Sequence, residues 1–318
     1  MQSVRPLKLQ LWCMENLILL VLCFGAGIAM RHWQLMPDHA PNALNTVILY
    51  LSLPAVTLIQ VPQLSLEWAL IFPALASWLL FLGAWLLFGW AGRRYFGLSL
   101  PVAGCLVLTC GLGNTSFVGF PLLQAYYGEA ALQYGVLADQ PGAFLVLATL
   151  GIGLATRFQG GRLSARESIG RVVRFPPFVA FMAGMLILLL PVELPTVARD
   201  VLQPLALTLT PLALLSVGLQ LRLRPQGVPL KAVMAGLGYK LFLAPLMIAL
   251  LFSPFLTPSG LLFKVSVVES AMAPMITAAI VASDHRLAPQ LANSMVGLGI
   301  PLSLLTASVW YYILEWIS

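Results

Sequence analysis

Two short polar stretches inside otherwise apolar sequence decide the fold of this chain: GLGNTSFVGFP at residues 111–121 and ESAMAPM at residues 269–275. The first contains three glycines, an asparagine, two hydroxyl side chains and a proline within eleven residues. This composition is unfavourable for a helix interior, and a proline removes a backbone donor and collides with the preceding turn. We therefore predict that both stretches interrupt a helix, with a kinked but continuous helix as the alternative for either one alone.

The sequence around these stretches is typical of a membrane protein. The chain has 318 residues, of which 60% are hydrophobic and 9% charged, and its mean hydropathy is +0.92. Because soluble domains carry about 25% charged residues, the composition excludes an ordinary soluble enzyme, a disordered protein and a nucleic-acid-binding protein. A helix of about 20 apolar residues spans a bilayer, so the chain holds about ten spans. An all-α polytopic membrane protein is predicted, since an open sheet leaves its backbone unsatisfied in lipid.

Uncharged stretches bounded by charged or turn residues give the positions of the spans. The predicted spans are residues 9–30, 42–61, 68–91, 100–126, 132–156, 175–192, 201–221, 232–253, 260–283 and 289–314. A cleaved signal peptide is the alternative for the first, but Glu15 and Asn16 interrupt its apolar run and no small-x-small cleavage site follows. The two polar stretches fall in the fourth and ninth spans.

The distribution of Lys and Arg predicts the orientation in the membrane. Of 17 such residues, twelve lie in the loops after odd-numbered spans and four on the opposite side, while Lys240 lies inside a span. Because cytoplasmic loops are enriched in Lys and Arg, both termini are predicted to lie outside the cytoplasm. A plasma membrane, the inner membrane of a bacterium, is the expected location. The five arginines of the longest loop, residues 157–174, are interpreted as determinants of this topology.

The longest loop also divides the chain into two halves. The predicted units are a first five-helix repeat at 1–156, a cytoplasmic basic loop at 157–174 and a second five-helix repeat at 175–318. Because five is odd, the second half must be inserted upside down. Pro141 and Pro301 occupy similar positions in the two halves, and Leu53-Pro54-Ala55 resembles Pro211-Leu212-Ala213. The pattern predicts inverted repeats with discontinuous fourth and ninth helices, an architecture found in many secondary transporters.

The interrupted spans are the predicted substrate site. If each helix restarts near its proline, the N–H groups of Leu122–Leu123 and Met275–Ile276 face the membrane midplane with about half a positive charge at each end. Two such ends favour an anion, and a carboxylate fits best. The predicted substrate-binding residues are Asn114, Thr115, Ser116, Gly119, Pro121, Ser270, Pro274 and Met275.

Asp139, Lys240 and Glu269 are ionisable residues that lie well inside predicted spans. Charged groups within the bilayer are costly and are usually functional or paired. One hypothesis makes Asp139 the carboxylate that couples transport to protons, with Glu269 as the alternative carrier and Lys240 as partner or substrate counter-charge. The other makes them a structural Lys–carboxylate pair that holds helices together. Lys264 lies nearer a span end and is expected to extend toward the interface.

The order of these motifs resembles that of the auxin efflux carrier family. The resemblance rests on residues 113–121, Leu53-Pro54, the run 211–219, Asp139-Gln140 and the segment from Lys240 to Pro245. It implies ten helices in two inverted halves, with helices 4 and 9 crossing at their prolines. It also implies a transport unit of helices 3–5 and 8–10 that moves against a scaffold of helices 1, 2, 6 and 7. The scaffold helices are the candidate surface for a homodimer, and the short central loop is typical of compact prokaryotic members.

Family members move organic anions such as auxin or small dicarboxylates. The sequence therefore predicts a secondary transporter of small organic anions that works by alternating access, with no cofactor. The alternatives are a channel-like or structural membrane protein, or an ion-coupled symporter of the same inverted-repeat superfamily. An enzyme is not expected, because the chain has no His-x-x-Glu-His, Gly-x-Ser-x-Gly, Cys/His cluster or phosphate-binding loop. The expected partners are the organic anion and the lipid bilayer, with no nucleic acid.

Overall fold

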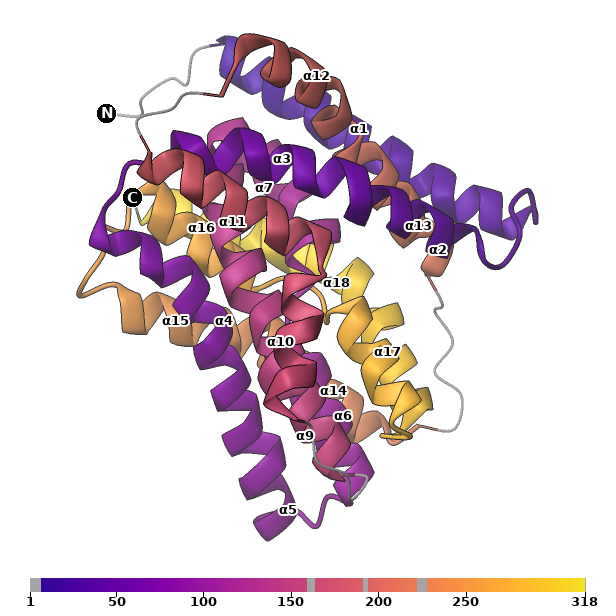
Figure 1. Ribbon diagram of the computed structural model, residues 1–318. Helices are drawn as coiled ribbons and strands as arrows, with labels where there is room; N and C mark the ends of the chain where they lie inside the picture. The colour runs from indigo at the N-terminus through magenta and orange to yellow at the C-terminus, as the bar shows by residue number, and fades with distance from the viewer. Residues whose placement is uncertain (1–6, 159–163, 191–193, 222–227, 318) are drawn as a thin grey trace.

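The described part of the molecule is helical throughout. A computed structural model describes residues 7–158, 164–190, 194–221 and 228–317, with side chains from Ile18 onward except that of Ala165. Within these ranges all regular elements are helices, and one isolated antiparallel β-bridge joins Gly113 to Pro274. The prediction of an all-α protein is confirmed (Figure 1). Arg162, Arg222 and Arg224, which contribute to the predicted orientation, lie outside the described residues.

Helices follow one another with short connections in the first half of the chain. They are α1 (Leu7–His32), α2 (Ala40–Val47), η1 (Ile48–Ser52), α3 (Leu53–Gln60), η2 (Val61–Gln63), η3 (Trp68–Leu70), α4 (Ile71–Ala84), η4 (Trp85–Ala91), α5 (Gly92–Tyr95), α6 (Leu100–Gly111), η5 (Thr115–Gly119), α7 (Phe120–Tyr127), η6 (Glu129–Ala131), α8 (Leu132–Leu137), η7 (Ala138–Phe144), η8 (Leu147–Gly151) and α9 (Ile152–Phe158). Here η1, η4, η5, η7 and η8 are π-helical, and the others labelled η are 3₁₀-helical.

The second half continues in the same manner. Its helices are α10 (Ala165–Val173), α11 (Pro176–Leu189), α12 (Thr196–Leu207), α13 (Leu209–Gln220), α14 (Leu230–Gly238), the π-helical η9 (Tyr239–Leu243), α15 (Ala244–Phe252), α16 (Leu261–Ser270), α17 (Ile276–Asp284) and α18 (Pro289–Trp316).

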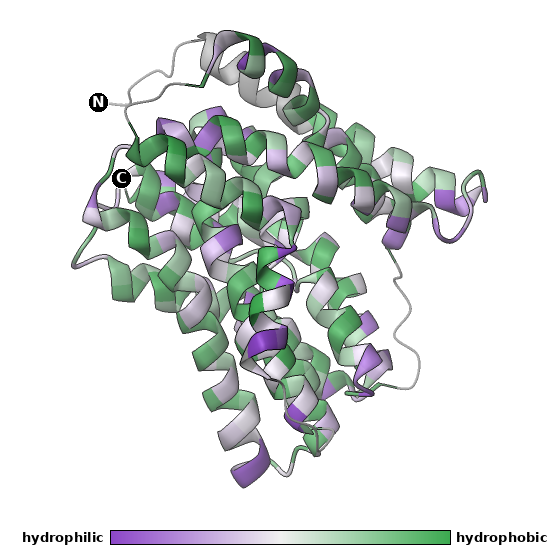
Figure 2. Cartoon of the chain, viewed as in Figure 1, coloured by the Kyte–Doolittle hydropathy of each residue, from purple (hydrophilic) through white to green (hydrophobic). Residues whose placement is uncertain are grey.

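Six continuous helical stretches in the described ranges are long and apolar enough to cross a membrane. They are Ala40–Gln63, Trp68–Tyr95, Glu129–Phe158, Thr196–Gln220, Leu230–Phe252 and Pro289–Trp316, and they match predicted spans 2, 3, 5, 7, 8 and 10. Arg166–Val173 and Pro176–Leu189, bent by 74°, make a seventh if they are counted together. Hydrophobic residues cover most of these helices (Figure 2). The protein is therefore a multi-pass membrane protein, and the count of ten spans stays a prediction because the remaining apolar helices are shorter.

The predicted fourth and ninth spans are both interrupted. In the fourth, α6 ends at Gly111 and the chain becomes helical again at Thr115; in the ninth, α16 ends at Ser270 and α17 begins at Ile276. The interruption of span 9 includes Pro274, as expected. The expectation that span 4 restarts at Pro121 is wrong, because this proline is the second residue of α7 and η5 leads into α7 without a gap.

The π-helical turn explains how Pro121 is tolerated there. The N–H of Phe120 donates to the carbonyl of Thr115, five residues earlier, instead of four as in an α-helix. The wider turn leaves room for the proline ring, so the N–H groups of Leu122–Leu123 do not form the helix end that the sequence predicted.

The helices pack in two groups. In the first, α1 packs on α13, while α11 and α12 pack on α3. In the second, α4 packs on α6 and η7, α15 on α16, and α17 on α18 and α6. Figure 1 shows most of the first group across the upper part of the molecule and α4, α6, α14 and α17 below it.

The first group is held by direct backbone contact between α1 and α13. A Cβ added to Gly27 would lie 2.9 Å from the Cα of Gly218, and one added to Gly218 would lie 3.0 Å from the Cα of Gly27. Only glycine at both positions allows this approach, because any side chain would have to occupy the space of the opposite backbone.

Candidate functional site

The two interruptions meet and are joined through their backbones. The N–H of Asn114 donates to the carbonyl of Ala273 at 2.8 Å, and the N–H of Met275 donates to the carbonyl of Leu112 at 3.0 Å. These bonds form the bridge between Gly113 and Pro274. They also satisfy backbone groups that an interrupted helix leaves without intrahelical partners. Spans 4 and 9 therefore cross, although the bridge at Gly113 lies eight residues before Pro121.

Asn114 caps the restarted helix and keeps one hydrogen-bonding group free. Its Oδ1 accepts a hydrogen bond from the N–H of Phe117 at 3.2 Å, as an N-cap residue does. Its Nδ2 is buried and has no partner among the described atoms. A buried amide nitrogen without a partner is costly, so a ligand oxygen placed there would be favoured.

The start of α17 is a second helix end at the crossing. Met275 is its N-cap residue, and no side chain caps the helix. The first intrahelical bond runs from the N–H of Ala279 to the carbonyl of Met275. The first N–H groups of α17 are therefore available to an acceptor, and the partial positive charge of this end favours an anion.

The carboxylate of Asp139 is bound by side chains close to the crossing. Thr115 Oγ1 donates to Asp139 Oδ1, and Gln140 Nε2 donates to Oδ2. All three residues are buried. Ser116, beside Thr115, is buried as well, so the structure brings three predicted site residues to the first turn after the bridge: Asn114, Thr115 and Ser116.

A break in span 5 positions Asp139. Pro141 lies inside η7, and Gly142 has non-helical angles (φ −89°, ψ −105°). Two side chains of α4 bind carbonyl groups of this region: Ser77 Oγ donates to Ala138 at 3.1 Å and Trp78 Nε1 to Pro141 at 3.0 Å. Two backbone carbonyl groups beside the break are thereby satisfied inside the protein.

Glu269 and Lys240 also lie beside the crossing, and they do not form an ion pair within 4.0 Å. Lys240 Nζ donates to the carbonyl of Ser270 at 3.1 Å, and both carboxyl oxygens of Glu269 are buried without a partner among the described atoms. Lys240 and Glu269 line one cavity of about 10 Å³ together with Gly113 and Thr115. That volume is at the lower limit for one water molecule, about 10–15 Å³.

No ion pair within 4.0 Å joins Lys240 to Asp139 or Glu269 among the described side chains, and both hypotheses for these three residues, coupling and structural pairing, stay predictions. Among the side chains that the structure describes, one ion pair has a distance below 4.0 Å: Lys264 Nζ lies 2.7 Å from Glu315 Oε1. Lys264, predicted to extend toward the interface, donates to Glu315, the second-last residue of α18.

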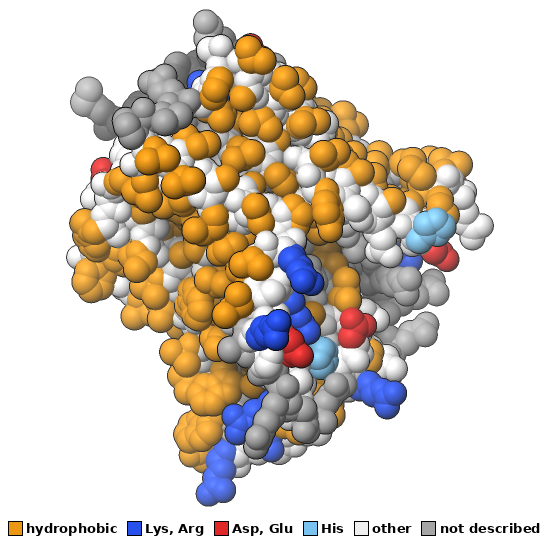
Figure 3. All heavy atoms as spheres, viewed as in Figure 1, with side chains coloured by type: hydrophobic (Ala, Val, Ile, Leu, Met, Phe, Trp, Pro, Cys, Tyr) orange, Lys and Arg blue, Asp and Glu red, His pale blue; other side chains and the backbone are white. Residues whose placement is uncertain are grey.

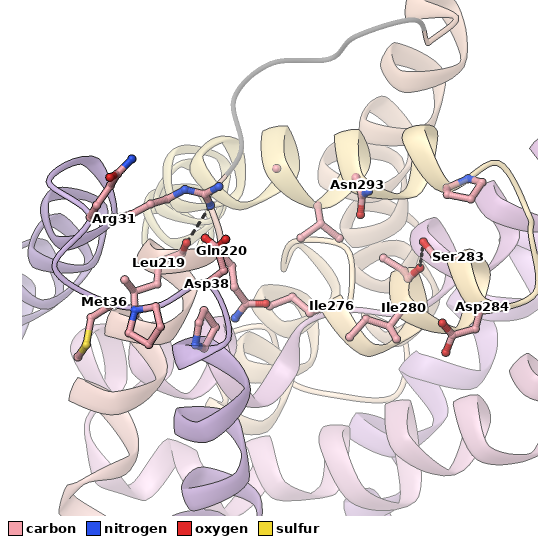
Figure 4. Close-up of a pocket in the computed structure, with 17 residues that line it drawn as sticks. Arg31, Met36, Asp38, Leu219, Gln220, Ile276, Ile280, Ser283, Asp284 and Asn293 are labelled. Carbon is pink, nitrogen blue, oxygen red and sulfur yellow. Dashed lines mark hydrogen bonds between the residues drawn. The ribbon is translucent and has the colours of Figure 1, made fainter.

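A large cavity leads to the start of α17. It has a volume of about 770 Å³ and is lined by the segment between α1 and α2, the end of α13, and α17 and α18. Figure 4 shows Arg31, Asp38 and Gln220 on one wall and Ile276 and Asp284 on the other. Asp38 and Asp284 are exposed whereas Ile276 is buried, so the cavity opens at the surface and ends at the first residue of α17. We call it the vestibule.

Three glutamines close the side of the crossing away from the vestibule: Gln60, Gln124 and Gln203. We call this group the glutamine seam. They line a cavity of only about 20 Å³ between α3, α7, α12 and α13. Thr210 Oγ1 of α13 donates to Gln124 Oε1 of α7 at 2.8 Å across this seam.

Several predicted substrate-binding residues have contacts or positions that differ from those expected. Gly119 lies against the carboxyl group of Glu269, and the hydroxyl of Ser270 donates within its own helix to Ser266 at 2.7 Å. Pro121 lies away from the bridge, in α7. Sequence reasoning did not identify Ser77 or the pair Gln124–Thr210, since single polar residues in apolar spans carry no local signal.

Comparisons with known proteins identify a family for the chain. A family model described as membrane transport protein matches residues 12–311. The chain is 27% identical over 304 residues to an uncharacterized transporter of Methanothermobacter thermautotrophicus, covering 94% of this chain and 98% of the relative. It is 24% identical over 314 residues to an uncharacterized transporter of Methanocaldococcus jannaschii, covering 95% and 98%. The chain therefore belongs to the membrane transport protein family, whose members are auxin efflux carrier-like.

Proposed function

We propose that this protein is a secondary transporter that moves small organic anions across the membrane by alternating access. The observation that carries the proposal is the joined pair of helix interruptions. There, an uncapped helix N-terminus at the inner end of the vestibule lies beside the buried, unpartnered amide of Asn114. Such a site favours a carboxylate, because amide N–H groups and the helix end both interact favourably with negative charge.

The rest of the vestibule suits the body of a small organic molecule. Ile276, Ile280 and Val296 line it with apolar surface near the start of α17, while Asn293 and Gln220 offer neutral polar groups. The carboxylate would bind at the crossing, and the apolar part of the anion would lie against the isoleucines. Asn114 is enclosed, so binding requires the crossing to open slightly toward the vestibule.

The two sides of the crossing suggest how access alternates. The vestibule is open on one side and the glutamine seam is closed on the other. By the distribution of Lys and Arg, the open side faces the cytoplasm and both termini lie outside. In the proposed cycle the helices of the second packing group move with the crossing against those of the first, which closes the vestibule and opens the seam. Ten spans in two inverted halves would provide this symmetry.

Coupling to protons is proposed to use a carboxyl group beside the crossing. Asp139 is connected to the site through Thr115, so a change of its charge would act directly on the first turn of η5. Glu269 is the alternative carrier, and its two unpartnered oxygens support that role. Lys240 is the counter-charge within the same small cavity.

Uptake into proteoliposomes tests the proposal. The purified chain is reconstituted and offered a panel of labelled mono- and dicarboxylates under imposed pH and voltage gradients. Saturable uptake of at least one carboxylate, at carrier rates, is expected. Ionic currents far above carrier turnover would instead indicate a channel, and the absence of movement of every carboxylate would contradict the proposed substrate class.

A further inference from the structure

The helix α10 stands apart from the transport site. It follows α9 after residues outside the described part and begins with a capping box: the N–H of Glu167 donates to Ser164 Oγ at 3.2 Å, and the N–H of Ser164 donates to Glu167 Oε2 at 3.3 Å. Because these reciprocal bonds satisfy free groups at the helix start, α10 has its own local reason to form. They also occupy the carboxylate of Glu167.

The side chains of α10 fall on three flanks. Residues four apart in a helix lie on the same side. Val172 is buried and Ser168 half-buried on the flank that packs against the protein. Ile169 and Val173 form a second flank and are 62% and 57% exposed.

Three other exposed side chains of α10 are basic, and the exposed acid Glu167 lies among them. Arg166, Arg171 and Arg174 are exposed, and none of them forms an ion pair within 4.0 Å with a side chain that the structure describes. In Figure 3 most Lys and Arg side chains of this face gather on its lower half, below the apolar upper surface. Exposed aliphatic and unpaired basic side chains on one short helix are typical of a helix in the plane of a membrane interface.

The direction of α10 agrees with that location. Arg166–Val173 and α11 are bent by 74° at the break between them. Since α11 is apolar and coincides with predicted span 6, α10 runs nearly along the bilayer surface where that span ends. In this position Ile169 and Val173 reach the acyl chains, and the guanidinium groups reach the headgroups.

We infer that α10 lies in the membrane interface and binds the phosphate headgroups of anionic phospholipids through Arg166, Arg171 and Arg174. Arginine suits this ligand because its planar donors match phosphate oxygens. The binding is separate from transport of the organic anion, and it assigns these arginines a ligand in addition to their effect on topology.

Native mass spectrometry of the full chain in neutral detergent, titrated with phosphatidylglycerol or phosphatidylcholine, tests the charge requirement. Wild type is expected to bind phosphatidylglycerol preferentially. The triple variant Arg166→Gln, Arg171→Gln, Arg174→Gln should lose about a hundredfold in affinity, since each basic residue near an anionic surface contributes about fivefold. The matched control Arg93→Gln, Arg94→Gln removes two basic residues from α5 and should keep the binding.

The location is tested by fluorophores attached to Ile169→Cys and Gly170→Cys in phosphatidylglycerol vesicles. Lipid-borne nitroxide should quench the probe at position 169 more strongly, and aqueous iodide the probe at 170. The inference is overturned if the triple variant binds phosphatidylglycerol like wild type. It is also overturned if both probes respond alike, or if inorganic phosphate at equal concentration displaces the lipid. If the triple Arg→Gln variant does not fold, the variant with Lys at positions 166, 171 and 174 is measured instead. Because it keeps the positive charges, it should bind phosphatidylglycerol more tightly than variants with a single Arg→Gln change, and weaker binding would overturn the inference.

Discussion

Gly119 of η5 lies directly against the carboxyl group of Glu269 in α16: a Cβ added to Gly119 would lie 2.6 Å from Oε1 and 2.8 Å from Cδ. Because α16 continues into the crossing, this contact ties the position of a buried acid to the helix that carries Asn114. The absence of a side chain at position 119 is therefore a requirement of the site.

Gly119→Ala is expected to displace Glu269 and to abolish transport. Overpacking of this kind lowers the free energy of unfolding by about 1–3 kcal/mol, which a lower unfolding temperature in detergent would report. Gly238→Ala is the matched control, since a Cβ there meets nothing within 4 Å. Normal uptake by Gly119→Ala would show that the close contact does not matter for transport.

Asn114→Ala is expected to abolish transport while the protein still inserts and purifies. The variant loses the cap on Phe117, worth about 0.5–2 kcal/mol, and the amide donor that we assign to the carboxylate. Asn114→Ser separates these effects, because a hydroxyl can still cap the helix but reaches less far. We expect it to recover the unfolding temperature without recovering substrate affinity in a binding assay; recovery of affinity would remove the amide from the site.

Asp139→Asn is expected to permit exchange of substrate but to abolish accumulation driven by a pH gradient. The change keeps the shape of the side chain and one oxygen that can accept from Gln140, while the new amide nitrogen can donate to the Thr115 hydroxyl, which must then accept instead of donate. It removes the proton that can be exchanged. Glu269→Gln is the comparison, measured in the same proteoliposomes. If Asp139→Asn still concentrates substrate and Glu269→Gln does not, the carrier is Glu269.

Thr210→Val should favour the state in which the glutamine seam is open. The substitution removes the donor to Gln124 and keeps the side-chain volume, so about 1 kcal/mol is lost from the closed seam. A cysteine in place of Gln60 should then react faster with an impermeant thiol reagent added outside. Thr149→Val, which removes a hydroxyl bonded within its own helix, should leave that rate unchanged.

The orientation can be measured at Gly170, where an added side chain meets no atom within 4 Å. In a variant whose four native cysteines are replaced, Gly170→Cys is expected to react with impermeant reagents only from the cytoplasmic side. Labelling of intact cells from outside would reverse the proposed topology.

The sequence predicts the existence of the crossing better than its position. Glycine, asparagine and proline are locally incompatible with a regular helix, so residues 111–121 and 269–275 are recognisable without a structure. The position of the break depends on η5, whose wide turn accommodates Pro121 and shifts the restart to Thr115. A π-helical turn is stabilised by tertiary packing and has no simple local signature.

The partners of the buried charges could not be predicted for a related reason. Thr115 and Asp139 are 24 residues apart, and Lys264 and Glu315 are 51 residues apart. Each pair exists because two helices pack side by side, which periodicity along one helix does not reveal. Asp139 and Lys264 themselves were identifiable, since ionisable residues in apolar spans are rare, whereas Glu315 lies just beyond the predicted tenth span.

The joint between the two interruptions contains no side-chain atom: it consists of main-chain N–H and carbonyl groups of residues 112, 114, 273 and 275. Exchange of the side chains at Leu112 or Ala273 therefore leaves both of its hydrogen bonds possible. The joint thus constrains the course of the main chain at these residues and leaves the identity of their side chains unconstrained by its two hydrogen bonds.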